Sequence, residues 1–356
     1  MIRKKDYMND KPNTTSRQEP DHLTALSAFS KPGFHTAADI EFSGPISVRM
    51  EDESPAIQAA PAYDRAAAAA FIPAMPKIRA LIDSIREDAE LICFGTSEPP
   101  EEALKVLEDE IRKLSTDNHK VSLLMADLMT RSGVSCRSSL KMCTQSTVKA
   151  IYVGALIESR QEALAENGQY MHDAIVYSDN ASYENLRKIY GIQPIKKWCE
   201  EAGVDTAFAE QLYPRTYTAR DMFKMWTRLY SFLNGDADKT NFAAYYADSI
   251  ASATAKQLSD PVQTKAGWEN GLGDYREFSV SDIPIQYRDG DPENDECAIN
   301  DTGIVYTQNG PYIFVIYTDH PYAILHGKEM PNPLNDLVKA LRAVQAGIAG
   351  NRNTVQ

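Results

Sequence analysis

The chain has 356 residues, 43% of them hydrophobic, which is enough for one large domain or two ordinary ones around a sizeable core. Its net charge of −13 excludes a typical nucleic-acid surface, because phosphate binding requires clustered lysine and arginine. The sequence contains no run of about 18 apolar residues, so we expect no transmembrane helix. The N-terminus begins with basic residues but has no apolar region behind them, so either the protein is cytosolic or the native export segment is absent from the chain.

The five cysteines and six histidines are scattered along the chain and predict no metal site. They include neither a CxxC pair nor a zinc-site spacing. A dispersed, odd set of cysteines is typical of buried free thiols, since cysteine is among the most buried residue types. Pairing of Cys136 with Cys143 across a hairpin stays open as an alternative for an exported protein.

Composition divides the chain into four parts. Residues 1–60 are polar without a sustained period, and we expect them to be largely disordered. Residues 61–99 favour helix but are interrupted by Pro73 and Pro76, and their role is left open. Residues 100–348 carry regular periodic patterns and are expected to form the main domain. Residues 349–356 are a tail.

The main domain is predicted to be α+β. A strong helix start at 97–102 precedes leucine and isoleucine residues spaced three and four apart. From residue 146 to residue 235 the chain is mostly helical, with a loop expected at 166–168, and an amphipathic helix closes the domain at 331–348. Strands are expected at residues 119–130, 131–139, 262–270, 301–307 and 312–319. The terminal helices would then pack on one face of an antiparallel sheet, and the helical middle would form a second lobe.

Three short motifs follow one another along this domain. STVK at 146–149 fits S-x-x-K and opens an apolar helix, SDN at 178–180 stands in a turn between helices, and KAG at 265–267 is close to K-T-G on a strand. Each motif is weak alone. Their order and their structural settings together indicate one active site.

In these motifs the chain resembles the serine penicillin-recognising superfamily, and within it the class A β-lactamase-type hydrolases. The segments LEDEIRKLS, TYTARDMFKMWTRL and NDTGIVYTQNGPYIFVIYT also resemble the family's first helix, the helix after its omega loop and its last strand pair. The resemblance covers residues 100–348. It implies a β-lactamase/transpeptidase-like fold, with an antiparallel sheet packed by N- and C-terminal helices plus a helical lobe.

The residue types suit acyl transfer. Residues three apart share a helix face, so Lys149 would lie beside Ser146, and a buried lysine with a lowered pKa can serve as the base for a serine nucleophile. The resemblance implies that Ser178 relays a proton to the leaving nitrogen and that Asn180 binds the substrate amide. It also implies that Lys265 holds the substrate carboxylate and supports Ser178.

The resemblance assigns the oxyanion hole to the backbone N–H groups of Ser146 and Trp268. Gly267, directly before Trp268, belongs to the same substrate-binding strand. Each candidate also has a structural alternative: a helix N-cap for Ser146, a surface position for Lys149 or Lys265, turn chemistry for residues 178–180, and a core position for Trp268.

Three departures from the family pattern bear on mechanism. Class A enzymes carry a loop glutamate in an E-x-x-L-N setting that activates the deacylating water, whereas Glu210, the possible water activator here, is followed by Gln-Leu-Tyr. Ala266 replaces a hydroxyl residue that would bind the substrate carboxylate. Only 32 residues separate Ser146 from Ser178, which predicts a trimmed helical lobe and a more open cleft.

The sequence therefore predicts a serine hydrolase that acts on an amide, of the β-lactam or D-alanyl-peptide type, through an acyl-enzyme on Ser146. It needs no metal or organic cofactor, and its expected partner is a β-lactam or a peptidoglycan stem peptide, not a nucleic acid. One alternative is a D,D-peptidase or penicillin-binding protein with slow deacylation. Another is a non-catalytic binding module that keeps the fold. The resemblance also implies action outside the cytoplasmic membrane, although no export signal is visible, and the oligomeric state stays open.

Overall fold

The computed structural model describes most of the chain from Tyr63 onward. The predicted disorder of residues 1–60 and the position of Cys297 lie outside the described residues. The described ranges are 63–86, 88–116, 119–214, 216–235, 240–269, 298–320, 322, 324–325 and 328–351.

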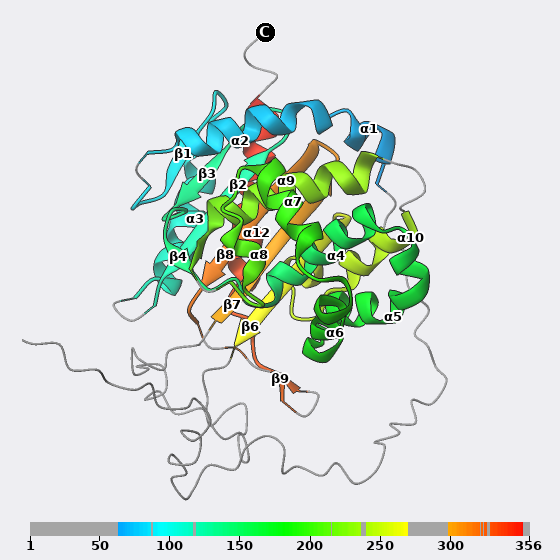
Figure 1. Ribbon diagram of the computed structural model, residues 1–356. Coiled ribbons are helices and arrows are strands. Elements are labelled where there is room, and N and C mark those ends of the chain that lie inside the picture. The colour runs from blue at the N-terminus through cyan, green and yellow to red at the C-terminus, as the bar shows by residue number, and fades with distance from the viewer. Residues whose placement is uncertain are drawn as a thin grey trace, which may run out of the picture. The chain divides into compact units, whose positions relative to one another are not determined.

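A six-stranded antiparallel sheet forms the centre of the fold, in the order β1-β3-β2-β8-β7-β6 (Figure 1). The five strands expected from the sequence are all present. β1 was not predicted, because three residues are too few to display an alternating pattern. The strands are β1 (Ile92–Phe94), β2 (Val121–Asp127), β3 (Ser132–Cys136), β6 (Val262–Glu269), β7 (Ala298–Thr307) and β8 (Gly310–Thr318).

Both faces of the sheet are buried, which explains why the central strand β8 is apolar from Tyr312 to Tyr317. In β8, Ile313, Val315 and Tyr317 join one core cluster, while the intervening Phe314 and Ile316 join the other. Such alternation follows from the period of two in an extended strand. Each face therefore needs its own layer of helices.

Helices α3 (Glu101–Leu114) and α12 (Asn335–Gly350) cover one face, and this confirms the predicted pairing of the terminal helices. Helix α9 (Ala219–Gly235) crosses the opposite face, in front of the strands in Figure 1, where α12 lies behind them. The family fold predicted for the chain, a sheet between terminal helices and a helical lobe, is thus confirmed.

The helical lobe is built around α4 (Val148–Ser159), and ten of its twelve residues are buried. At Gly154 a side chain would meet Leu229 at 2.6 Å and Trp198 at 2.9 Å, so the close packing of α4 against its neighbours requires a glycine. The other helices of the lobe are α5 (Glu162–Val176), α6 (Asn180–Tyr190), α7 (Gln193–Ala202) and α8 (Ala207–Glu210).

The loop expected at 166–168 is reduced to a kink within α5. Asn167 adopts the non-helical φ of −137°, and two helical segments meet there. The sequence therefore located the interruption correctly, but the interruption is one non-helical residue and not a loop of three. The Asn167 amide donates to Tyr190 at 2.7 Å, which joins the kink to α6.

Residues before the predicted domain pack into the core on the face of the sheet that α9 covers. Helix α1 (Arg65–Ala69), the short turn η1 (Ile72–Ala74) and helix α2 (Met75–Ser84) pack along α9, with Ile78 and Ile82 fully buried. Lys224 of α9 forms an ion pair with Asp83 at 2.9 Å. Pro73 and Pro76 stand at the starts of η1 and α2, where proline costs little.

The remaining elements are short. Within the described ranges, no helix combines the length and apolarity needed to cross a membrane. No disulfide joins Cys136 to Cys143, because Cys136 packs in the buried cluster beneath α3 and α12. The short elements are β4 (Lys141–Met142), paired with β5 (Tyr217–Thr218), η2 (Gln145–Thr147), α10 (Thr240–Ala243), η4 (Ala244–Asp248), α11 (Ala253–Gln257), β9 (Ile324–Leu325) and β10 (Lys328–Glu329).

Candidate active site

Ser146 lies in the 3₁₀ turn η2, directly before the buried helix α4, and only 9% of its surface is exposed. The preceding Gln145 has φ +48°, a left-handed conformation that is costly for a residue with a side chain. Two residues before Ser146, the Thr144 amide donates to Pro214 at 2.9 Å. Thr147 is the N-cap of α4 and makes no capping bond through its side chain, so Ser146 is not the N-cap.

Lys149 is fully buried and faces the SDN turn. Its Nζ donates to the Ser178 carbonyl at 2.5 Å and to Asn180 Oδ1 at 2.6 Å, and it lies 3.5 Å from Ser178 Oγ. Burial lowers the pKa of Lys149 to about 7, although the negative charges of Asp179 and Glu184 act to raise it. The surface alternative for Lys149 is excluded by its burial, and the lowered pKa favours the neutral amine near neutral pH.

In the part of the chain that the structure describes, no hydrogen bond joins the Ser146 hydroxyl to Lys149 Nζ. The two residues are three positions apart across the start of α4, so they lie on the same side of the helix. Catalytic hydrogen bonds are often long before substrate binds and tighten in the complex. The geometry therefore fits a nucleophile and base that engage when substrate arrives.

Ser178 lies between two lysines. Lys265 of β6, which is also fully buried, donates to Ser178 Oγ at 2.9 Å and to the carbonyl of Ala266 at 2.6 Å. Burial and the nearby charge of Lys149 hold the pKa of Lys265 well below its usual range. A surface position for Lys265 is thus excluded. A hydroxyl held between two amines of lowered basicity is suited to relaying a proton.

Asp301 is a buried carboxylate that the motifs did not indicate. It lies opposite Ala266 in the β6–β7 register and accepts from the Thr254 amide at 2.9 Å and from Ser252 Oγ at 3.1 Å. Burial raises the pKa of Asp301 to about 6, although these hydrogen bonds and the charge of Lys265 act to lower it. Its charge in turn acts to raise the pKa of Lys265, against the larger effects of burial and of Lys149.

Strand β6 approaches Ser146 closely at Gly267. A Cβ atom there would lie 2.6 Å from the Ser146 amide nitrogen and 2.9 Å from that of Thr147, so only glycine fits. Lys265 and Gly267 are two residues apart and therefore face the same side of the strand. Trp268 is half-buried, its ring meets Tyr322 edge-on at 6.2 Å, and Lys265 Nζ lies 5.9 Å from the ring centroid.

Asn180 begins α6 and contacts a residue that the sequence did not indicate, Tyr213. The Tyr213 hydroxyl donates to Asn180 Oδ1 at 2.9 Å, beside the bond from Lys149. The neighbouring Asp179 caps α6 by accepting from the Ser182 amide at 2.6 Å, so part of the SDN motif does serve turn chemistry. The only sequence signal for Tyr213 is an aromatic residue before Pro214 in a short loop.

Glu210, the possible water activator, is exposed at the end of α8. Among the residues described, no hydrogen bond or ion pair joins Glu210 to the lysines and serines of the site. Burial raises the pKa of Tyr217, and the charge of Glu210 contributes to this shift only after several other groups. The loop instead directs Tyr213 toward the site, three residues after Glu210.

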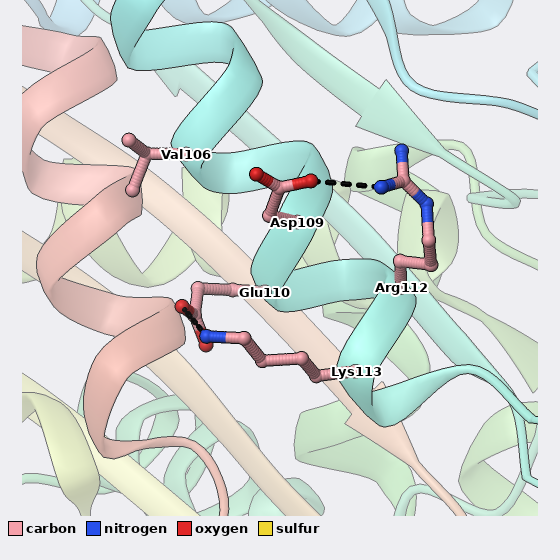
Figure 2. Close-up of a pocket in the computed structure, with 5 residues that line it drawn as sticks. All are labelled: Val106, Asp109, Glu110, Arg112 and Lys113. Atoms are coloured by element: carbon pink, nitrogen blue, oxygen red, sulfur yellow. Dashed lines mark hydrogen bonds and ion pairs between the residues drawn. The ribbon is translucent and has the colours of Figure 1, made fainter.

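A surface depression over α3 lacks the features of a reaction site. Figure 2 shows its five lining residues, all on this one helix, with Arg112 joined to Asp109 and Lys113 joined to Glu110. These ion pairs are largely exposed and contribute little. For the described ranges, no group of three or more histidine, cysteine, aspartate or glutamate residues is arranged to hold a metal ion.

Comparison with known proteins points to one family. The family model described as the Beta-lactamase enzyme family matches residues 161–344, more than half of the chain. This range contains Ser178, Asn180 and Lys265 but begins after Ser146. No curated protein matched the sequence.

Solved structures similar to this chain include several β-lactamases at low identity. One from Streptosporangium roseum is 17% identical, covers 72% of this chain and 99% of its own, and has a TM-score of 0.46. The carbapenemase VCC-1 from Vibrio cholerae is 14% identical, with coverages of 68% and 98% and a TM-score of 0.45. One from Desulfarculus baarsii is 16% identical, with coverages of 69% and 96% and a TM-score of 0.45. On the match of the family model, the chain belongs to the Beta-lactamase enzyme family.

Proposed function

We propose that the protein is a serine hydrolase that cleaves an amide bond through an acyl ester on Ser146. One observation carries the proposal. Lys149, a fully buried lysine whose pKa burial lowers to about 7, stands one helical turn from a serine and bonds into the SDN turn. Burying an amine costs free energy, and a base poised near neutral pH is what a serine nucleophile requires.

In the acylation step, Ser146 Oγ forms a bond to the amide carbon and its proton passes to the neutral amine of Lys149. The backbone N–H groups of Ser146 and Trp268 bind the resulting oxyanion. The carbon–nitrogen bond then breaks, and the leaving nitrogen takes a proton from Ser178 Oγ. Lys149 returns its proton to Ser178. Water later hydrolyses the ester, which releases the acid and restores the serine.

The substrate class follows from the groups around Ser146. The Lys265 amine can donate hydrogen bonds to a substrate carboxylate, and the amide of Asn180 can bind a substrate amide. Gly267 lets the substrate-binding strand approach the nucleophile closely. A β-lactam and a peptide ending in D-alanine both carry a carboxylate and a susceptible amide in this relation, so both are proposed substrates.

Slow deacylation is favoured by the loop beside the site. A general base must lie within hydrogen-bond reach of the water it activates, and Glu210 is exposed without a bond to the site residues described. The acyl ester on Ser146 is therefore expected to persist. This makes a D,D-peptidase or penicillin-binding protein the second candidate function.

The test is intact-mass measurement after incubation with benzylpenicillin. Wild type is expected to gain the mass of one penicillin, and Ser146→Ala is expected to gain none. Ser159→Ala is the matched control, because Ser159 ends the same helix and only bonds the Leu156 carbonyl. Hydrolysed drug without an adduct would indicate an efficient β-lactamase. If the measurement finds neither an adduct nor hydrolysed drug, penicillin is refuted as a substrate, and the non-catalytic binding module is favoured.

A further inference from the structure

Three consecutive residues of the loop after α8 are tied to the candidate site. The Leu212 carbonyl accepts from the Tyr183 hydroxyl at 3.1 Å, and the Tyr213 hydroxyl donates to Asn180 at 2.9 Å. The Pro214 carbonyl accepts from both the amide and the hydroxyl of Thr144, at 2.9 and 3.0 Å. The loop is therefore fixed on both sides of Tyr213, and the position of this side chain is defined.

The ring of Tyr213 forms part of the wall around the amine of Lys149. Lys149 Nζ lies 5.6 Å from the Tyr213 ring centroid and 5.8 Å from that of Tyr183. The two rings are 5.7 Å apart and tilted, so together they enclose one side of the amine. The titratable and charged groups facing this amine are Lys265 of β6, Asp179 and Glu184 at the start of α6, and the phenols of Tyr183 and Tyr213.

The hydroxyl of Tyr213 acts on the amide of Asn180. An amide oxygen has two lone pairs, and Asn180 Oδ1 accepts from Lys149 Nζ and from the Tyr213 hydroxyl. With both positions filled, the amide cannot turn over without losing two hydrogen bonds. Its NH₂ group is thereby directed away from Lys149 and is available as a donor to substrate.

We propose that Tyr213 is a positioning residue of this site, whose ring keeps water from Lys149 and whose hydroxyl fixes the Asn180 amide for substrate. The side chain itself does not exchange a proton with substrate. Burial keeps the phenol protonated, since it raises the pKa of Tyr213 above its usual range. The role of the hydroxyl rests on the proposed function, because it is tested by catalysis. The role of the ring is tested by the titration of Lys149, which does not require activity.

Two substitutions test the role of the Tyr213 ring and the role of its hydroxyl separately. Tyr213→Phe keeps the ring and removes the hydroxyl, while Tyr213→Ala removes both, with Tyr213→Gln as a second variant should the alanine variant not fold. Tyr170→Ala is the matched control, because Tyr170 is a partly exposed tyrosine of α5. The activity-independent readout is the titration midpoint of Lys149, obtained from the pH dependence of unfolding for each variant with and without Lys149→Met.

Tyr213→Ala is expected to raise this midpoint by about one pH unit or more, because water then reaches the amine. Tyr213→Phe and the control are expected to leave it unchanged. The catalytic readout is the rate of acylation by benzylpenicillin relative to 6-aminopenicillanic acid, which lacks the side-chain amide. Tyr213→Phe is expected to lower this ratio about fivefold, as for the loss of one hydrogen bond.

An unchanged midpoint in Tyr213→Ala would overturn the role of the ring, and an unchanged ratio in Tyr213→Phe would overturn the role of the hydroxyl. Absence of any acylation in wild type would refute the proposed function and the substrate-positioning role together. In that case the titration midpoint still decides whether the ring protects Lys149, so the two failures are distinguishable.

Discussion

Replacing Lys149 with methionine is expected to stabilise the protein at neutral pH while removing its proposed base. In the unfolded chain a lysine takes up a proton below about pH 10.5, but in the folded protein Lys149 does so only below about pH 7. The folded state is therefore penalised increasingly as the pH falls from about 10.5 to about 7. Methionine has a similar length and carries no charge, so it removes this penalty.

The magnitude follows from the shift in pKa. At about 1.4 kcal/mol per pKa unit, the penalty amounts to about 4 kcal/mol at pH 7 and about 2 kcal/mol at pH 9. Methionine also leaves the buried Ser178 carbonyl without its donor, which costs about 1–2 kcal/mol at every pH. The net gain is about 2 kcal/mol at pH 7, and it disappears near pH 9.

The assay is denaturant unfolding of wild type and Lys149→Met at pH 7 and pH 9. The stability difference between them is expected to fall by about 2 kcal/mol between the two pH values. Lys105→Met is the matched control, because Lys105 is exposed on α3. A difference that does not change with pH would refute the reasoning, since it would mean that Lys149 is protonated in the folded protein as in the unfolded chain.

Two further substitutions test the nucleophile region and the N-terminal packing. Gly267→Ala is expected to slow acylation of Ser146 at least about 100-fold, as for the loss of an oxyanion donor, because its Cβ would press on the Ser146 amide at 2.6 Å. Mass adduct formation over time measures this rate. Gly168→Ala is the control, because its added Cβ would meet Leu164 Cδ1 at 3.7 Å, an ordinary van der Waals contact, and an unaffected rate in Gly267→Ala would exclude the close approach of β6. Ile82→Ala is expected to lower the free energy of unfolding by about 2–5 kcal/mol, because this fully buried residue packs α2 into the core. Thermal unfolding checks it against the half-buried Leu81→Ala, and equal small losses in the two variants would mean that α2 is not part of the cooperative core.

The sequence by itself determined the features that depend on local pattern. The strand pair Val121–Cys136, the C-terminal hairpin and the terminal helices were predicted because alternation, turn residues and helical spacing are readable within a dozen residues. The three-residue spacing within STVK likewise predicts that Lys149 lies on the same helix face as Ser146. The order of the three motifs indicated the family, which the family model then confirmed.

Only the tertiary structure decided what surrounds these residues. Ser178 and Lys265 are 87 positions apart, and their contact depends on the return of β6 beside the helical lobe. The same packing turns Tyr213 toward the site and leaves Glu210 exposed, although Glu210 ends α8 and Tyr213 follows it by only three residues. Burial, and with it the pKa of Lys149, is a property of every element packed around the amine, so no local pattern contains it.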